Sequence, residues 1–361
     1  MAEIRLEGVA HSYDGGKTQA LNPITMTWED GKAYALLGPS GCGKTTLLNI
    51  ISGLLKPSEG KIFIDGKDVT NIATDERNIA QVFQFPVLYD TMTVRKNLEF
   101  PLKNRKIPRD QVAKRVAEIA ELLGLEKDLD RKPSKLRSDL QQIVSLGRGL
   151  VRSDVAAILF DEPLTVIDQN FKWTLRNRLK RLHLSTGVTV VYVTHDQTEA
   201  LTFADEVLVM DKGSLVQAGT PDELFLEPQH EFVGYFIGSP GMNFLDVDVK
   251  SSILSHNGQP IGVATKPGLE GKHRFGVRPE FLVPSNNSGI EFKVDRVEDR
   301  GVFKLIHLKK DDFKFIAKVE ENYVVSASGT AHFTFDSKRA FLFDANKKIV
   351  AGVSPSNQGG N

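Results

Sequence analysis

Residues 38–45 read Gly-Pro-Ser-Gly-Cys-Gly-Lys-Thr. It fits the pattern G-x-x-x-x-G-K-[ST], follows an apolar run at residues 32–37, and opens a helical pattern at residues 46–49. Its glycines let backbone N–H groups surround phosphate oxygens at the start of a helix. The sequence therefore predicts a phosphate-binding loop that holds a nucleotide.

The side chains of this loop have different expected roles. Lys44 is expected to reach the β- and γ-phosphates, and Thr45 to offer its hydroxyl to Mg²⁺. Cys42 is interpreted as a small filler within the nucleotide site rather than as a redox group. The other positions expected to line the nucleotide are Gly38, Ser40, Gly41, Gly43 and Thr46.

Two carboxylates follow a second apolar run at residues 156–160. A carboxylate at the end of a strand can hold Mg²⁺, and a second one can orient and deprotonate an attacking water. We assign Asp161 to the first role and Glu162 to the second. A further apolar run, residues 189–194, ends at His195, which is expected at the same sheet edge and in reach of the γ-phosphate.

The first two thirds of the chain alternate between strand and helix patterns. Apolar runs at residues 79–83, 156–160 and 188–193 alternate with helical periodicity at residues 112–123 and 174–184. Such alternation predicts an α/β domain with a largely parallel sheet. We place this domain at residues 1–237.

The last third has a different character. Gly-Ser-Pro-Gly at residues 238–241 is typical of a linker, which we place at residues 238–243. Short alternating strands then predict an all-β domain over residues 244–353. Residues 354–361 contain only small and polar residues and proline and are expected to form a flexible tail.

Composition excludes several classes of protein. Lys plus Arg equals Asp plus Glu at 46 each, so no global field favours nucleic acid as a partner. The single cysteine cannot form an internal disulfide, which favours the cytosol. The N-terminus lacks the basic and apolar pattern of a signal peptide, and the apolar runs are far short of the ~20 residues of a membrane-spanning helix.

The order of Lys44, Asp161, Glu162 and His195, with Gln84 between the first two, resembles the nucleotide-binding subunits of ATP-binding cassette (ABC) transporters. The likeness spans essentially the whole chain. It implies an ATPase that binds ATP and Mg²⁺, with a RecA-like core and a helical subdomain at about residues 87–153.

The resemblance also implies roles for three further residues. Tyr13 would stack on adenine, and Gln84 would bind Mg²⁺ and sense the membrane subunit. Asp168 would contribute to the nucleotide site across a dimer interface, although the family usually has Ser-Asn-Leu before this residue and the chain has Thr-Val-Ile.

Residues 83–94 and the β-rich C-terminal part, with Gly-Val-Arg-Pro-Glu at residues 276–280, resemble importers of the carbohydrate and glycerol type. This implies an OB-like regulatory domain, two membrane permeases, a second ATP-binding subunit, and indirectly an extracytoplasmic solute-binding protein. The chain would lie peripherally on the cytoplasmic face of the inner membrane. The favoured solute is glycerol or a related polyol.

One segment departs from the family. Where the family has leucine, serine, two glycines and glutamine, residues 136–142 read Leu-Arg-Ser-Asp-Leu-Gln-Gln. Asp139 would face a polyanion, which opposes binding by about 4 kcal/mol for one charge pair at about 4 Å and an effective dielectric of about 20. Arg137 could offset part of this cost, and Ser138 with Gln141 fits a capping box. We therefore favour a heterodimer in which a second ATPase supplies an intact segment, with a homodimer as the alternative.

The sequence leaves open the class of function and the role of the β domain. A soluble cassette protein of the translation or DNA-repair type is the alternative function. It is disfavoured because soluble twin-cassette factors carry two P-loops and this chain has one, and because the repair type has a long coiled coil in a region where only 92 positions separate Lys44 from Leu136. A GTPase is disfavoured because no N-K-x-D motif is present. The β domain is either regulatory or a dimer-stabilising appendage.

Overall fold

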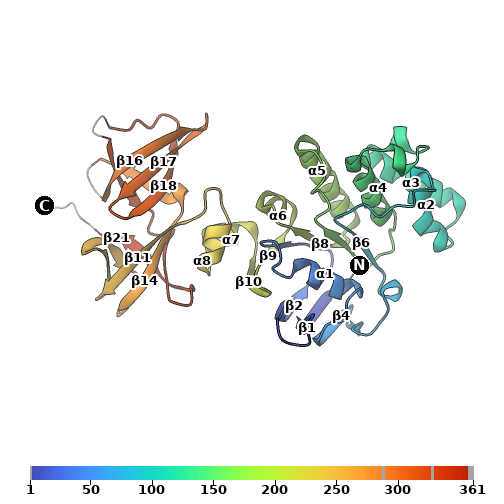
Figure 1. Cartoon of the computed structure of the whole chain (residues 1–361), viewed down its shortest axis with the longest axis horizontal. Helices are drawn as coiled ribbons and strands as arrows, with labels where there is room; N and C mark the ends of the chain where they lie inside the picture. The colour runs from blue at the N-terminus through green and yellow to red at the C-terminus, as the bar shows by residue number, and fades with distance from the viewer. Residues whose placement is uncertain (1, 287–288, 327–328, 357–361) are drawn as a thin grey trace. The chain divides into compact units, whose positions relative to one another are not determined.

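The chain divides into two compact units, Met1–Pro221 and Asp222–Asn361, in a computed structural model that describes residues 2–286, 289–326 and 329–356 (Figure 1). The division lies earlier than the boundary after residue 237 that we expected. As a consequence, two short helices, α7 (Pro221–Leu226) and α8 (Glu231–Phe236), belong almost entirely to the second unit.

The centre of the first unit is a six-stranded sheet with the order β10-β9-β3-β8-β7-β6. All neighbours are parallel except β10, which is antiparallel to β9, so the predicted parallel sheet is confirmed. Carboxyl ends of parallel strands share one edge, which brings the loops after β3, β7 and β8 together. The strands are β3 (Ala33–Leu37), β6 (Ile79–Val82), β7 (Ala157–Asp161), β8 (Thr189–Thr194), β9 (Glu206–Asp211) and β10 (Ser214–Gly219).

A four-stranded antiparallel sheet shares a core with this sheet and with α1 (Lys44–Ser52). Leu47, Leu48 and Ile51 of α1 are buried against apolar side chains of both sheets, which fixes the helix that begins at the phosphate-binding loop. The strands are β1 (Ile4–His11), β2 (Leu21–Trp28), β4 (Glu59–Ile64) and β5 (Lys67–Asp68).

Helices α2 (Val94–Asn104), α3 (Arg109–Leu123) and α4 (Ser138–Leu150) pack on one another and lie inside the segment 87–153 assigned to a helical subdomain. Their buried residues join those of the sheet and of α5 (Gln169–Thr186) in one hydrophobic core. The last helix of this unit with a role in the site is α6 (Gln197–Phe203). No helix among the described residues is long and apolar enough to cross a membrane.

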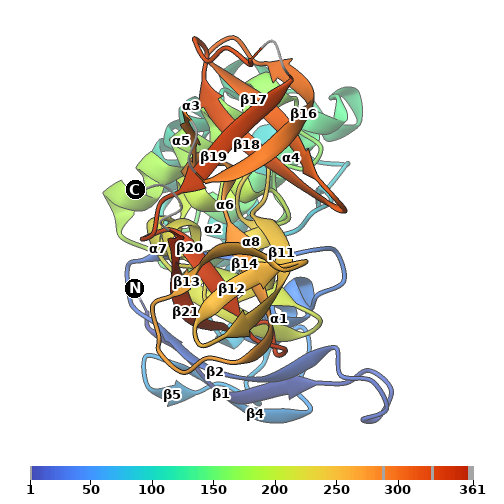
Figure 2. The ribbon, with the colours of Figure 1, turned by 90° about the vertical axis from the view of Figure 1, so that its left-hand side faces the viewer.

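The second unit contains a closed antiparallel barrel and a five-stranded sheet, β15-β19-β16-β17-β18 (Figure 2). The barrel confirms the predicted OB-like β domain. Barrel strands are β11 (Asn243–Lys250), β12 (Ile253–His256), β13 (Gln259–Ala264), β14 (Gly271–Val277), β20 (Ala340–Phe343) and β21 (Ile349–Pro355). Sheet strands are β15 (Leu282–Ser285), β16 (Ile290–Asp299), β17 (Phe303–Lys310), β18 (Phe313–Glu320) and β19 (Thr330–Phe335).

The barrel takes in the start of the segment that we expected to be a flexible tail. Ser354 pairs with Val263 and Pro355 with Gly262, so β21 continues to Pro355. The strand pairing orders these residues despite their polar composition. Residues 357–361 lie outside the described residues.

Arg278 explains why α7 and α8 belong to the second unit. Its buried guanidinium donates to the carbonyl oxygens of Phe225 at 2.7 Å and Gly234 at 3.1 Å, and to those of Leu224 and Ile237. Burial lowers the pKa of Arg278 to about 10, which leaves the group charged at neutral pH. The two helices are therefore anchored to the loop that follows β14.

Candidate nucleotide-binding site

The phosphate-binding loop requires glycine for two separate reasons. Gly41 and Gly43 have φ values of +79° and +98°, which other residues adopt at a cost. A Cβ at Gly38 would lie 2.3 Å from the carbonyl oxygen of Met210, and one at Gly43 would lie 2.7 Å from that of Ala20. The loop thus keeps its backbone close to its neighbours and presents N–H groups at the start of α1.

Lys44 is buried inside this loop. Its Nζ donates to the carbonyl oxygens of Gly38 at 2.8 Å and Pro39 at 2.9 Å. A buried ammonium next to the N–H groups of a helix N-terminus fits a phosphate group by charge and by hydrogen-bonding type. Cys42 is also buried, with Sγ 3.8 Å from Nζ of Lys44, and burial raises the pKa of its thiol.

Thr45 and Asp161 form the part of the site that fits a magnesium ion. The Thr45 hydroxyl donates to Oδ1 of Asp161 at 3.1 Å, and Asp161 is only 6% exposed, so burial raises the pKa of its carboxyl. Hydroxyl and carboxylate oxygens are the donors that Mg²⁺ prefers. No three His, Cys, Asp or Glu residues gather to hold a metal in the part of the chain that the structure describes.

Glu162 is the meeting point of three loops. Its Oε2 lies 3.0 Å from Nδ1 of His195 and accepts from Nε2 of Gln84 at 3.4 Å and from Oγ1 of Thr165 at 3.2 Å. Its φ of +45° is rare for a residue with a side chain, and such strain occurs mainly at functional sites. The predicted neighbours Gln84 and His195 are thus brought to Glu162, whereas sequence reasoning missed Thr165.

Tyr13 lies between β1 and β2 with its side chain 66% exposed. Its hydroxyl shares a hydrogen bond with Oγ1 of Thr46 at 3.1 Å, which places it at the first turn of α1. The ring of His11 packs edge-on against Tyr13 with centroids 4.5 Å apart. The exposed ring is available to a flat ligand next to the phosphate-binding loop, and sequence reasoning missed the support from His11.

The predicted capping box at α4 is wrong. Ser138 is the first helical residue, and the N-cap is Arg137, which has no acceptor to offer the helix N–H groups. Gln141 instead donates through Nε2 to the carbonyl oxygens of Pro133 and Leu136, both at 3.1 Å. Arg137 forms an ion pair with Asp139 at 2.5 Å, so the expected partial compensation of charge occurs within the chain.

Asp168 lines a cavity next to the segment that departs from the family pattern. Arg137, Ser138 and Asp139 line a cavity of about 460 Å³ together with residues 165–168. The two segments that depart from the family pattern therefore face the same cavity. Any contribution of Asp168 to a nucleotide site has to be made from this face.

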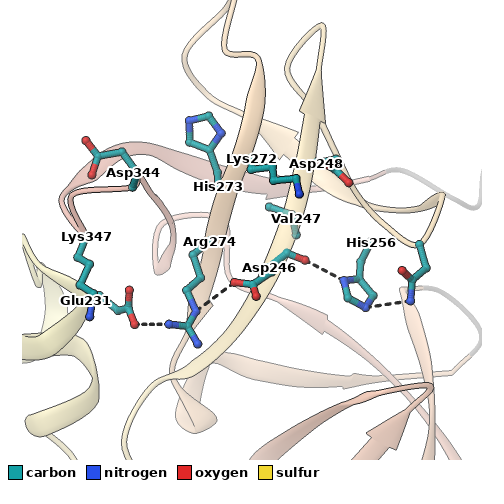
Figure 3. A pocket seen from close by; sticks show the side chains of 12 residues that line it. Glu231, Asp246, Val247, Asp248, His256, Lys272, His273, Arg274, Asp344 and Lys347 are labelled. Atoms are coloured by element: carbon teal, nitrogen blue, oxygen red, sulfur yellow. Dashed lines mark hydrogen bonds and ion pairs between the residues drawn. The ribbon is translucent and has the colours of Figure 1, made fainter.

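A separate cavity of about 480 Å³ lies in the second unit, and Figure 3 shows its lining. Arg274 is paired with Glu231 and, at 3.4 Å, with Asp246. His256 bonds through Nδ1 to the carbonyl oxygen of Asp246 at 2.7 Å and through Nε2 to Asp312 at 3.0 Å. Much of the charge in this cavity is thus compensated within the barrel and its contacts.

The first unit is a P-loop nucleotide-binding cassette by its fold and by the arrangement of Lys44, Asp161 and Glu162. A family model described as "ABC transporter" matches residues 21–165. The chain is 39% identical to the trehalose/maltose import ATP-binding protein MalK of Thermococcus litoralis, over 95% of this chain and 98% of the relative. It is 38% identical to the oligosaccharides import ATP-binding protein MsmX of Bacillus subtilis, over 97% of this chain and 99% of that relative.

A third relative is the sn-glycerol-3-phosphate import ATP-binding protein UgpC of Brucella abortus, 41% identical over 87% of this chain and 89% of the relative. Among solved structures, the ADP- and Pi-bound dimer of the ATP-binding cassette MJ0796 is 30% identical, with a TM-score of 0.56 over 60% of this chain and 98% of that chain. The chain belongs to the ATP-binding subunits of ABC transporters, and is an ATPase that binds ATP.

Proposed function

We propose that the chain is the ATP-hydrolysing motor of a bacterial importer for a carbohydrate or polyol, with a glycerol-like solute favoured. The observation that carries the motor function is the bonding of one Glu162 oxygen to both Gln84 and His195, beside the Thr45–Asp161 pair. The names of the relatives support the solute class, because trehalose, maltose, oligosaccharides and sn-glycerol 3-phosphate are all polyhydroxylated.

The residues divide the chemistry between them. Lys44 and the loop N–H groups bind and orient the phosphates, while Tyr13 stacks on the adenine. Thr45, Asp161 and Gln84 would hold Mg²⁺, which when bound offsets the negative charge of the phosphates. Glu162 accepts the proton of the attacking water.

His195 has two functions in this proposal. It keeps the Glu162 carboxylate oriented through the 3.0 Å contact, and its exposed ring is available to the γ-phosphate. Gln84 connects the same carboxylate to the segment that precedes α2. Hydrolysis at Glu162 is thereby linked to movement outside the nucleotide site.

An exposed apolar segment directly after Gln84 supports a docking site for the permeases. Phe85 is 69% exposed and Val87 51%, and Arg148 stacks over the ring of Tyr89 with 4.7 Å to its centroid. Large exposed apolar side chains clustered in this way mark interaction sites. Two permeases docked here would hold the chain on the cytoplasmic face of the inner membrane, and would connect it indirectly to an external solute-binding protein.

We propose a non-identical ATPase as the second cassette. Arg137 and Asp139, which line a cavity with Asp168, place charged groups where the family has serine and glycine. A partner with an intact glycine segment would complete the site over Lys44 and Glu162, while this chain would serve the partner's nucleotide poorly. A homodimer is the alternative, and the deciding measurement is the composition of the complex purified with its permeases.

The second unit is proposed to regulate transport, with dimer stabilisation as the alternative. Removal of residues from Asp222 onward separates the two roles: regulation predicts transport that no longer responds to an effector, and stabilisation predicts loss of the dimer.

Uptake of labelled solutes tests the proposed function. A strain that lacks this chain is supplied with the wild-type chain or with Glu162→Gln, and uptake of glycerol, sn-glycerol 3-phosphate, maltose and trehalose is measured. We expect one solute to enter only with the wild-type chain. Equal uptake of every solute in all strains would contradict the importer function.

A further inference from the structure

Glu199 is a buried carboxylate that the proposed chemistry does not use. It is 5% exposed and lies in the first turn of α6. Its Oε2 accepts from Oγ1 of Thr194 at 2.9 Å and from the hydroxyl of Tyr192 at 3.1 Å, and its Oε1 lies 3.8 Å from Nζ of Lys172. A buried carboxylate is costly unless it is paired and hydrogen-bonded, so the function of this arrangement requires an explanation.

The first connection leads to His195. The Thr194 hydroxyl that donates to Glu199 also accepts from the backbone N–H of Asp196 at 3.0 Å. In an ordinary capping box, a glutamate at the third helical position bonds directly to the N–H of the N-cap residue. Here the N-cap is Asp196 and the Thr194 hydroxyl stands between it and Glu199. Both residues that flank His195 are therefore fixed by one hydroxyl.

Glu199 determines the direction of that hydroxyl. A threonine hydroxyl has one proton, so donation to Glu199 leaves its lone pairs for the N–H of Asp196. The Asp196 side chain then accepts from the N–H groups of Thr198 at 2.7 Å and Glu199 at 3.3 Å. Loss of the Glu199 acceptor frees the hydroxyl to rotate and loosens the peptide that carries His195.

The second connection leads to α5. Lys172 lies in the first turn of this helix, and its backbone N–H donates to the carbonyl oxygen of Asp168 at 2.9 Å. The Lys172 ammonium thus ties Glu199 to the end of the segment 165–168, which lines the cavity with Arg137 and Asp139. Two turns later, Lys180 donates to the carbonyl oxygen of Thr202 at 3.1 Å, which joins α5 to α6 without contact to Glu199.

We propose that Glu199 is a positioning residue for His195, and that Lys172 makes this positioning depend on the segment that ends at Asp168. The chain of contacts runs from Lys172 through Glu199 and Thr194 to the backbone of His195, whose ring lies 3.0 Å from Glu162. Movement at the cavity face is transmitted to the Glu162 carboxylate by this route. The inference rests on the function proposed above for His195.

Glu199→Gln tests the proposal in the assembled transporter, because the amide keeps the volume, removes the charge and leaves one acceptor oxygen in place of two. Either the Thr194 hydroxyl or the Lys172 ammonium then loses its acceptor. We expect the kcat of ATP hydrolysis to fall about tenfold, since a misplaced group loses its contribution. The KM for ATP should stay within about twofold, because the variant touches no nucleotide contact. Lys172→Met should have a smaller effect of the same kind, and Lys180→Met is the matched control that should change neither parameter.

A double-mutant cycle separates positioning from general stability. In a His195→Ala background, Glu199→Gln should lower kcat by less than about twofold, because its effect passes through the missing imidazole. Equal factors in both backgrounds would overturn the proposal.

A second measurement needs no turnover. In the full chain with labelled histidine, the ring resonance of His195, identified by its loss in His195→Ala, should move toward that of an exposed histidine in Glu199→Gln and in Lys172→Met. It should not move in Lys180→Met. An unchanged resonance in Glu199→Gln would overturn the proposal, whereas unchanged hydrolysis in His195→Ala would contradict only the function assigned to His195. Lys172→Met provides the same two readouts if Glu199→Gln does not fold.

Discussion

Nδ1 of His195 lies 3.0 Å from Oε2 of Glu162, at the carboxyl ends of two adjacent parallel strands. The same oxygen accepts from Gln84, so a single atom connects the loops that carry Gln84, Glu162 and His195. This relationship makes Glu162 the most informative position for testing the chemistry.

Glu162→Gln should retain ATP binding and lose hydrolysis by at least about 100-fold, because an amide cannot accept the proton of the attacking water. Nucleotide binding at equilibrium and ATP turnover are measured on the same preparation. Glu118→Gln, an exposed change on α3, is the control and should behave as the wild type. Comparable turnover in Glu162→Gln and wild type would refute the assignment of Glu162 as the base.

Gly38→Ala should weaken ATP binding at least tenfold. Its Cβ would lie 2.3 Å from the carbonyl oxygen of Met210, so the loop has to shift, at a cost of roughly 1–3 kcal/mol in the free energy of unfolding. Calorimetric titration with ATP and thermal unfolding measure the two effects. Gly268→Ala is the control for ATP binding: a Cβ there meets no atom within 4 Å, but the φ of +77° is costly for alanine, so this change should lower the stability without weakening ATP binding. Wild-type affinity in Gly38→Ala would show that the loop tolerates the side chain.

Cys42 should react slowly with alkylating reagents although it lies in the phosphate-binding loop. The thiol is buried, and burial raises its pKa, so the reactive thiolate is scarcer at a given pH than for an exposed cysteine. Mass spectrometry should find slow labelling in the native chain, faster labelling as the pH rises, and rapid labelling in denaturant. Labelling of the native chain as fast as of the denatured chain would contradict the buried position.

The double change Arg137→Ser and Asp139→Gly should promote association of the chain with itself in the presence of ATP. It removes a carboxylate from the cavity that faces a partner nucleotide in our proposal, and it allows closer approach of the backbone. Light scattering with ATP in a Glu162→Gln background measures the effect. Asp110→Gly, which removes an acidic residue from the first turn of α3, is the matched control. ATP-dependent dimers of the chain without the double change would contradict the proposed heterodimer.

His256 should make the stability of the barrel depend on pH. Burial lowers the pKa of His256, but the hydrogen bonds to Asp312 and to the carbonyl oxygen of Asp246 outweigh this, and the pKa is raised. A raised folded-state pKa means that the stabilisation is complete below the ordinary value of about 6.5 and is lost as the pH rises through the folded value. Hydrogen exchange of the β12 amides, corrected for the intrinsic rate, should show this loss in the wild type and not in His256→Gln. His273→Gln is the control.

The sequence predicted the phosphate-binding loop, Asp161, Glu162 and His195 because each follows an apolar strand, and parallel strands end at one edge. Thr165 could not be found this way, because its contact with Glu162 arises from a turn whose geometry depends on the positive φ of Glu162. The capping box failed because a shift of one residue in the start of α4 changes which side chain is the N-cap.

The division of the compact units at Asp222 has a different origin. The helices α7 and α8 are held in the second unit by contacts with residues far along the chain, among them Arg278, Arg274 and Arg339. A contact that joins residues 53 positions apart leaves no local pattern in the sequence. Local rules therefore recovered the elements, and long-range polar contacts determined how they are grouped.

The anchoring of α7 and α8 by Arg278 also limits how this chain can be recombined with its relatives. A chimera that exchanges only the barrel and the five-stranded sheet would separate the guanidinium from the carbonyl groups that receive it. The segment that can be exchanged as a whole begins near Asp222. A chimera joined at that point keeps α7 and α8 together with Arg278.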